Sequence, residues 1–210
     1  SVDGDPAPES QVDGEIPGLE PIKESLERIV TPGSPEAAVQ PTAGTSQSTP
    51  CSVNGVPEDF IKFPAGGAAG AQLSWGVKES FRNYVSGTIA NGSVEPIGGV
   101  SPAGDEFVWA SLPGAVKSAG SEGYFGPGTG GVHFQGHYGA LNLTLQNPCV
   151  EILSDTSARL YLDVEGQSLS GNTFSSLGVY FADLVLPPPS VENGQSVWAE
   201  AGTTLTEQGA

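Results

Sequence analysis

The pattern of apolar and polar residues predicts a chain built mainly of short strands. After Cys51, β-branched and aromatic residues alternate with polar ones in runs separated by Gly, Pro and Asn, a pattern typical of antiparallel strands. In "ALNLTLQNP", Leu141, Leu143 and Leu145 fall on one side and polar residues on the other, as in a strand with one buried face. Similar runs are "FVWASLPG", "GVHFQGHYG", "ARLYLDVEGQSLSG", "GVYFADLVLPPP" and "SVWAEAGTTL".

One stretch has a helical period instead. In "SWGVKESFRNYVSG", residues 74–87, one side of a helix would carry Val77, Ser80, Phe81, Tyr84 and Val85, with polar residues opposite. The predicted fold class is therefore mainly β, an antiparallel two-sheet sandwich or open barrel with one principal α-helix. The inward face of this helix carries two hydroxyl groups. From the helix alone, Tyr84 is either an ordinary core aromatic residue or a functional one.

The first 50 residues differ from the rest of the chain. They contain eight prolines, nine acidic residues and two basic ones, so they cannot bury enough apolar surface to offset their chain entropy. We predict a disordered or loosely docked tail over residues 1–50, followed by a domain over residues 51–210. Within the tail, "LEPIKESLERIV" has apolar residues at helical spacing and predicts a short helix at 19–30, which is marginal in isolation.

The charge of the chain argues against two classes of partner. The formal net charge is -17, with only seven lysines and arginines, whereas binding to nucleic acid or to anionic lipid depends on neutralising phosphates. No apolar run approaches the roughly 18 residues of a membrane-spanning helix. We therefore expect no nucleic-acid partner and no direct membrane insertion by this segment.

The two cysteines, Cys51 and Cys149, lie far apart and belong to no Cys/His cluster with metal-ligand spacing. If they pair, the disulfide closes a loop of roughly a hundred residues and is worth about 4–5 kcal/mol in the loop-entropy model. Such a bond indicates an oxidising, extracytoplasmic setting. The alternative is two buried free thiols.

Histidine chemistry is possible in only one part of the chain. The two histidines, His133 and His137, both lie in "GVHFQGHYGAL" and project to the same face if the strand is regular, although Gly136 can bend it. No nucleophile elbow is visible, and no acidic pair stands out. The glycine-rich "GPGTGG" at 126–131 lacks the Lys-Ser/Thr ending of a phosphate loop and predicts a hairpin turn. These observations argue against a hydrolase.

Several segments, taken in order, resemble one known family. "LSWGVKESFRNYVSG", "FVW", "GVHFQGHYGALNLTLQNPCVEI", "LYLDVEG", "FADLVL" and "TTLTEQGA" resemble the HtaA domain, a haem-binding module of actinobacterial cell-surface and secreted haem-uptake proteins. The resemblance covers residues 72–210. Family domains run on past the last motif into a Phe- and Tyr-containing segment that covers the haem, and this sequence stops at Ala210, so we expect an HtaA-like domain truncated at its C-terminus.

The resemblance implies a set of site residues. Tyr84 would be the axial ligand of ferric haem b, His137 would hydrogen-bond the phenolic oxygen of Tyr84, and Ser80 would lie near a haem propionate. A phenolate is a hard anionic donor that suits Fe(III). An imidazole that hydrogen-bonds the ligand is a typical supporting group at a metal site. His133 lies outside the matching motif and is as well explained by packing.

The function implied by the resemblance is non-enzymatic haem acquisition and relay at the cell envelope. Its partners would be haem, other haem-uptake proteins of the envelope, and host haemoproteins as the haem source. The protein would be secreted or attached to the cell surface. The alternative is a surface β-sandwich adhesin or glycan-binding module that uses Trp75, Trp109 and Tyr124 as a contact surface.

Overall fold

The computed structural model describes residues 51, 56–66, 70–118, 122–167, 171–192 and 195–209; the predicted tail and its helix at 19–30 lie outside these residues. The described elements, in chain order, are β1 (Phe60–Phe63), β2 (Ala71–Trp75), α2 (Glu79–Ser86), β3 (Ser93–Ile97), β4 (Ser101–Ala103), β5 (Glu106–Leu112), β6 (Gly114–Lys117), β7 (Gly123–Phe125), β8 (Gly131–Gly136), the 3-10 turn η1 (His137–Gly139), β9 (Leu141–Ser154), β10 (Ser157–Gln167), β11 (Thr173–Val185), β12 (Ser190–Glu192), β13 (Gln195–Val197) and β14 (Gly202–Leu205).

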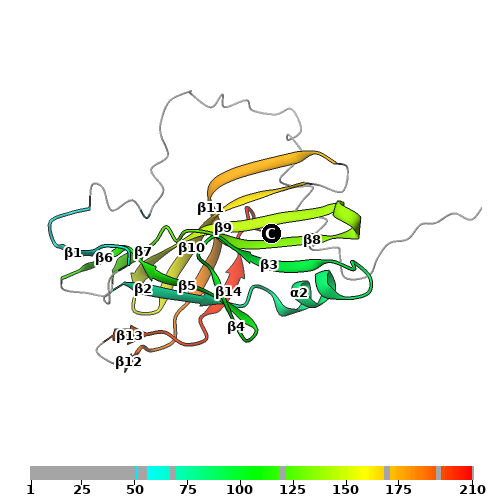
Figure 1. The fold of residues 1–210 in the computed structure, drawn as a ribbon. Coiled ribbons are helices and arrows are strands. Elements are labelled where there is room, and N and C mark those ends of the chain that lie inside the picture. Colours follow the sequence, from blue (N-terminus) through cyan, green and yellow to red (C-terminus); the bar gives the residue numbers. More distant parts are fainter. Residues whose placement is uncertain are drawn as a thin grey trace, which may run out of the picture.

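These strands form three antiparallel sheets (Figure 1). The main nine-stranded sheet runs β1-β6-β7-β9-β10-β11-β14, and β8 and β3 extend it from β9. A three-stranded sheet has the order β2-β5-β4, and β12 pairs with β13. The mainly β, antiparallel architecture with one α-helix in the described residues is therefore as the sequence predicted. No helix in this described part combines the length and apolar character needed to cross a bilayer.

The core lies on one face of the three longest strands, β9, β10 and β11. The leucine alternation predicted for "ALNLTLQNP" is present, because Leu141 and Leu145 are buried and Leu143 is half-buried on the same side. The three-stranded sheet supplies Phe107, Trp109 and Leu112 to the same core. Burial of this continuous apolar face is the main stabilising term of such a sheet.

The helix α2 is shorter than the amphipathic stretch that predicted it. Val77 has a φ of 54°, a left-handed conformation that a β-branched residue rarely adopts, so the helix begins only at Glu79. The aromatic ring of Phe81 packs on that of Phe134 in β8, with centroids 5.0 Å apart, and Val85 is fully buried. These contacts hold α2 beside β3 and β8 (Figure 1).

The glycine-rich segment at 126–131 does not form the predicted hairpin turn. β7 and β8 do not pair with each other; both pair with β9, β7 at Val150–Ile152 and β8 at Leu141–Gln146. The segment therefore carries the chain from one half of β9 to the other. Gly128 N donates to Pro148 O at 2.8 Å, and a side chain at Gly128 would collide with the Trp109 ring.

One aspartate joins irregularities in two strands at the middle of the sheet. The register of β10 shifts against β9 and against β11 around Asp163. Its carboxylate accepts from Asn147 Nδ2 and from the Gly178 main-chain N–H, each at 2.8 Å. Asn147 and Gly178 both have a positive φ, as expected of bulged residues. The carboxylate thus fixes both bulges at the same level.

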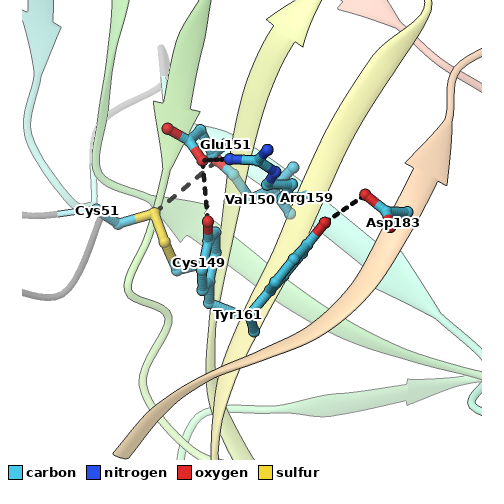
Figure 2. Close-up of polar contacts among 8 residues, drawn as sticks. Cys51, Cys149, Val150, Glu151, Arg159, Tyr161 and Asp183 are labelled. Carbon is cyan, nitrogen blue, oxygen red and sulfur yellow. Dashed lines mark hydrogen bonds and ion pairs between the residues drawn. A yellow bond between two sulfur atoms is a disulfide. The ribbon is translucent and has the colours of Figure 1, made fainter. Parts of the chain in front are cut away.

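The disulfide between Cys51 and Cys149 is formed, with the two Cα atoms 5.8 Å apart. The free-thiol alternative is thereby excluded. Figure 2 shows the bond beside a polar cluster on β9, β10 and β11, in which Glu151 accepts from Tyr161 and pairs with Arg159. The disulfide therefore ties β9 covalently to Cys51, which lies nine residues before the start of β1.

Candidate functional site

Tyr84 is held at the surface by the buried face of α2. Its neighbours Phe81 and Val85 are buried against the sheet, whereas Tyr84 is half-buried, so its ring packs on the core edge while its hydroxyl reaches beyond it. Burial raises the pKa of the Tyr84 phenol above the ordinary value of 10.0, because the charged phenolate is less well solvated there. In the free domain Tyr84 is therefore a protonated phenol at neutral pH.

His137 is presented by an unusual turn between β8 and β9. His137, Tyr138 and Gly139 have φ angles of 50°, 56° and 94°, a left-handed run that costs non-glycine residues of the order of 1–2 kcal/mol each. The main-chain N–H of His137 donates to Ala90 O at 2.7 Å, which anchors the turn to the loop after α2. Such strain persists where the surrounding structure enforces it, and it often accompanies function.

The two side chains meet across this junction. The Tyr84 hydroxyl and His137 Nε2 form a hydrogen bond, and the centroids of their rings are 5.8 Å apart with the ring planes at 45°. The imidazole can accept the phenolic proton through this bond, which leaves an anionic oxygen beside a cationic ring. The arrangement therefore provides a surface phenol whose deprotonation is assisted by a neighbouring base.

The other residues singled out by the sequence make no hydrogen bond to this pair. Ser80 is exposed on the first turn of α2 and makes no hydrogen bond to Tyr84 or His137. His133 does not share a face with His137, because β8 ends at Gly136 and the chain turns there. Its Nε2 lies 2.8 Å from Asn142 Oδ1, on the face of the sheet opposite Phe134. His133 is thus a hydrogen-bonded residue of the outer sheet face.

The aromatic surface considered as an alternative site is not assembled. Trp109 is 2% exposed, and its indole N–H donates to Gly130 O at 3.1 Å. The ring of Trp75 packs against that of Trp109, with centroids 6.4 Å apart, and edge-on against Phe181. Tyr124 stacks on Phe60 in another part of the domain. The three residues therefore do not form one contact surface.

Neither the pocket at Asp163 nor a cluster of metal-binding side chains offers a second site in the described residues. A pocket of about 310 Å³ lies around Asp163 and the 127–129 loop, and both oxygens of that carboxylate are already hydrogen-bonded. Among the described residues, no group of three or more His, Cys, Asp or Glu side chains could hold a metal ion. The Tyr84–His137 pair is therefore the candidate site.

The sequence did not predict what holds the site in place. The Ala90 carbonyl and the Phe81–Phe134 contact leave no mark of their own in a short motif. The only local signal of the left-handed turn is the flanking of His137 and Tyr138 by Gly136 and Gly139, since glycine favours such conformations. Tyr138, which is 99% exposed, was not singled out either.

Comparison with known proteins defines the class. The HtaA family model, described as "Htaa", matches residues 70–210, and the chain belongs to the HtaA family. Domains of this family are haem-binding modules, and the proteins that carry them are cell-surface haem-uptake proteins. No curated protein matches the chain.

Solved structures of HtaA from Corynebacterium glutamicum have the same fold. The C-terminal domain is 29% identical, with a TM-score of 0.57 over 66% of this chain and 83% of that one. The N-terminal domain is 26% identical, with a TM-score of 0.52 over the same shares. The domain-swapped dimer of the H434A variant of the C-terminal domain is 29% identical, with a TM-score of 0.52 over 68% and 84% of the two chains.

Proposed function

We propose that this domain binds ferric haem through the phenolate oxygen of Tyr84, with His137 as the supporting base. The observation that carries the proposal is the hydrogen bond between the two side chains, which come from elements 53 residues apart in the chain. Membership of a haem-binding family supports the same choice. Haem supplies a ferric ion, a hard Lewis acid, and two propionate carboxylates.

The residues present suit this ligand chemically. A phenolate is an anionic oxygen donor that favours Fe(III) over Fe(II). Because burial raises the pKa of the Tyr84 phenol, the proton must have somewhere to go, and His137 Nε2 is in hydrogen-bond contact with the oxygen. Transfer to the imidazole forms a phenolate–imidazolium pair without releasing a proton to water. The opposite charges of this pair then stabilise each other.

Ser80 has a proposed role at the porphyrin edge. It lies four residues before Tyr84, on the same side of α2, and its hydroxyl is exposed. From that position it can donate a hydrogen bond to a propionate, as the family resemblance implies. We place the whole binding unit within residues 51–210.

The biological role we propose is haem acquisition and relay outside the cytoplasm. The Cys51–Cys149 disulfide is consistent with an oxidising compartment, and the family consists of cell-surface haem-uptake proteins. The protein would accept haem from host haemoproteins and pass it to other envelope proteins. A surface ligand that is easily protonated again suits release as well as capture, so we propose a binding module and not an enzyme.

The direct test is titration of the colourless apoprotein with hemin. We expect one equivalent to bind and to produce a Soret band together with the charge-transfer absorption of a ferric phenolate. Free hemin in the same buffer and a denatured sample of the protein serve as controls. Failure to reach a defined 1:1 complex in folded protein would overturn the proposal.

A further inference from the structure

The strand β11 is paired along only part of its outer edge. Its C-terminal part, Ala182–Val185, pairs with β14, and Phe181 O accepts a hydrogen bond from Thr206 N at 3.0 Å. From Thr173 to Val179, β11 pairs with β10, and no other described strand lies along the opposite edge. In Figure 1 this half of β11 forms the upper margin of the sheet. Among the described strands, none pairs with the outward main-chain groups of Thr173–Val179.

This edge lacks two of the features that usually prevent strand addition, a charged residue and a proline, and the bulge at Gly178 interrupts only its last part. The outer strand on the other side, β3, carries Glu95 and Pro96 in its middle, and charge and proline both discourage edge pairing. By contrast, "TFSSLGV" at 173–179 contains no charged residue and no proline. Leu177 in this segment is 72% exposed. An unprotected edge with an exposed apolar residue is typical of a surface that binds an extended peptide.

The open edge lies at the same end of the sheet as the candidate site. Thr173 is in register with Gln167, which faces Asn142, and Asn142 in turn faces Gln135. Gln135 is two residues before His137. Since neighbouring strands are about 4.8 Å apart, the edge is roughly 14 Å from β8.

The charges around the edge select the occupant. Glu165 is paired with Ser175 on the outer face of the sheet, and the segments 131–147 and 163–179 contain no lysine or arginine. The whole chain carries a net charge of -17, so pairing of two copies would bring like charges together. An added strand with basic residues on the outer face of the sheet would instead be attracted by the negative charge of Glu165.

We propose that the edge of β11 from Thr173 to Val179 binds an extended, basic segment of a partner protein as an added β-strand. Main-chain hydrogen bonds to the free edge provide the common affinity, and basic side chains near Glu165 provide the preference. Apolar residues on the core-facing side of the added strand would lie next to Phe174, which packs against the core. The site is independent of haem binding and stands whether or not the domain takes haem.

The test uses the 210-residue chain and a synthetic ten-residue peptide of alternating Val and Lys. Hydrogen exchange is measured amide by amide with and without peptide, and binding is followed by fluorescence anisotropy. We expect at least a tenfold slowing of exchange within 173–179 at saturating peptide. The same peptide N-methylated at alternate residues should not bind, because it cannot complete the ladder, and a Val/Glu peptide should bind at least tenfold more weakly.

Matched variants locate the surface. Leu177→Lys should weaken binding of the Val/Lys peptide about tenfold, and Leu177→Glu should preserve or tighten it. Leu153→Lys is the control, since Leu153 is an exposed leucine of the same sheet outside this edge. Its affinity should equal that of the parent.

Four results would overturn the proposal. The first is unchanged exchange within 173–179 at millimolar peptide, and the second is equal binding of the N-methylated peptide, which indicates charge attraction alone. The third is slow exchange already present in the free monomer, which indicates a segment of the same chain on the edge. The fourth is protection that grows with protein concentration, which indicates a second copy.

Discussion

Two groups of tyrosines in this domain differ in the partner of the phenol. Tyr84 meets the imidazole of His137, whereas Tyr161 donates to Glu151 at 3.1 Å and Tyr180 donates to Asp183. The pKa of the phenol is raised in all three tyrosines. Burial is the cause for Tyr84 and the largest cause for Tyr161, where the charge of Glu151 adds to it. For Tyr180 the largest cause is the hydrogen bond to Asp183.

The partner decides what each phenol can do. A phenol bonded to a carboxylate must remain the donor, because losing its proton would place two negative charges side by side. A phenol bonded to an imidazole can pass its proton across the same bond and leave opposite charges. Only the second arrangement prepares a phenolate for a metal ion, so the raised pKa by itself does not identify a ligand tyrosine.

The largest expected effect is that of Tyr84→Phe on hemin binding. The substitution removes the proposed ligand oxygen and keeps the ring that packs at the core edge, so the fold should survive and binding should fall at least 100-fold. Tyr161→Phe and Tyr180→Phe are matched controls and should bind hemin like the parent. Absorption titration with circular dichroism checks this, and a folded Tyr84→Phe protein with the parent's spectrum would return Tyr84 to a purely structural role.

Loss of the disulfide should affect stability and spare the site. The bond joins residues 98 positions apart, for which the loop-entropy model gives about 4–5 kcal/mol. We expect the Cys51→Ala, Cys149→Ala double variant to lose a large part of its free energy of unfolding in urea. At temperatures where it is folded, its hemin affinity should match the parent. A parallel loss of affinity would mean that the two halves of the sheet are not separable.

His137→Ala should weaken hemin binding without abolishing it. The variant keeps the Tyr84 oxygen and loses only the group that supports it, a change that typically costs about 10- to 100-fold at metal sites. His133→Ala is the matched control, because His133 bonds Asn142 on the outer face and should change affinity less than threefold. Equal effects of the two substitutions would argue against the special role of the Tyr84 partner.

The smallest effect is expected from Glu151→Gln. The Arg159–Glu151 ion pair has an N–O distance of 3.8 Å and is partly exposed, and exposed pairs contribute about 0–1 kcal/mol. Chemical denaturation should show a change below about 1 kcal/mol, and hemin affinity should not move. A shift in hemin affinity would connect this cluster to the candidate site.

Local patterns in the sequence were enough for much of the fold. The alternation around Leu141–Leu145 gave the buried face of β9, and the helical period gave α2, although Val77 delays its start. The path of the 126–131 segment depends on pairing with β9, which local turn chemistry does not reveal, so the predicted hairpin was wrong. The bulges at Asn147 and Gly178 likewise depend on Asp163, a contact between three different strands.

The candidate site was accessible only in part. Helical spacing exposed Ser80 and Tyr84 as a hydroxyl pair, but the choice of Tyr84 and His137 as partners came from the family resemblance, because no local rule joins residues 53 positions apart. The structure brings this pair together, and Ser80 makes no hydrogen bond to either residue.

The tyrosines bonded to carboxylates were not identified from the sequence. "VYFAD" places Asp183 three positions after Tyr180. The partner of Tyr161, however, is Glu151 on the neighbouring strand, which no local pattern reveals.

The double anchorage of Asp163 gives the domain a natural boundary for redesign. The Asp163 carboxylate fixes the bulges of β9 and β11 opposite each other. The strand pairing on the disulfide side of Asp163 is therefore set independently of the pairing on the other side. Residues can be added in pairs to β10 and β11 on the side of Asp163 away from the disulfide, in the arms of these two strands. The pairing near the disulfide would not shift, since an even insertion keeps every side chain on its own face. Lengthening these arms would enlarge the end of the domain that carries the Tyr84–His137 pair, while the end that holds the disulfide would stay unchanged.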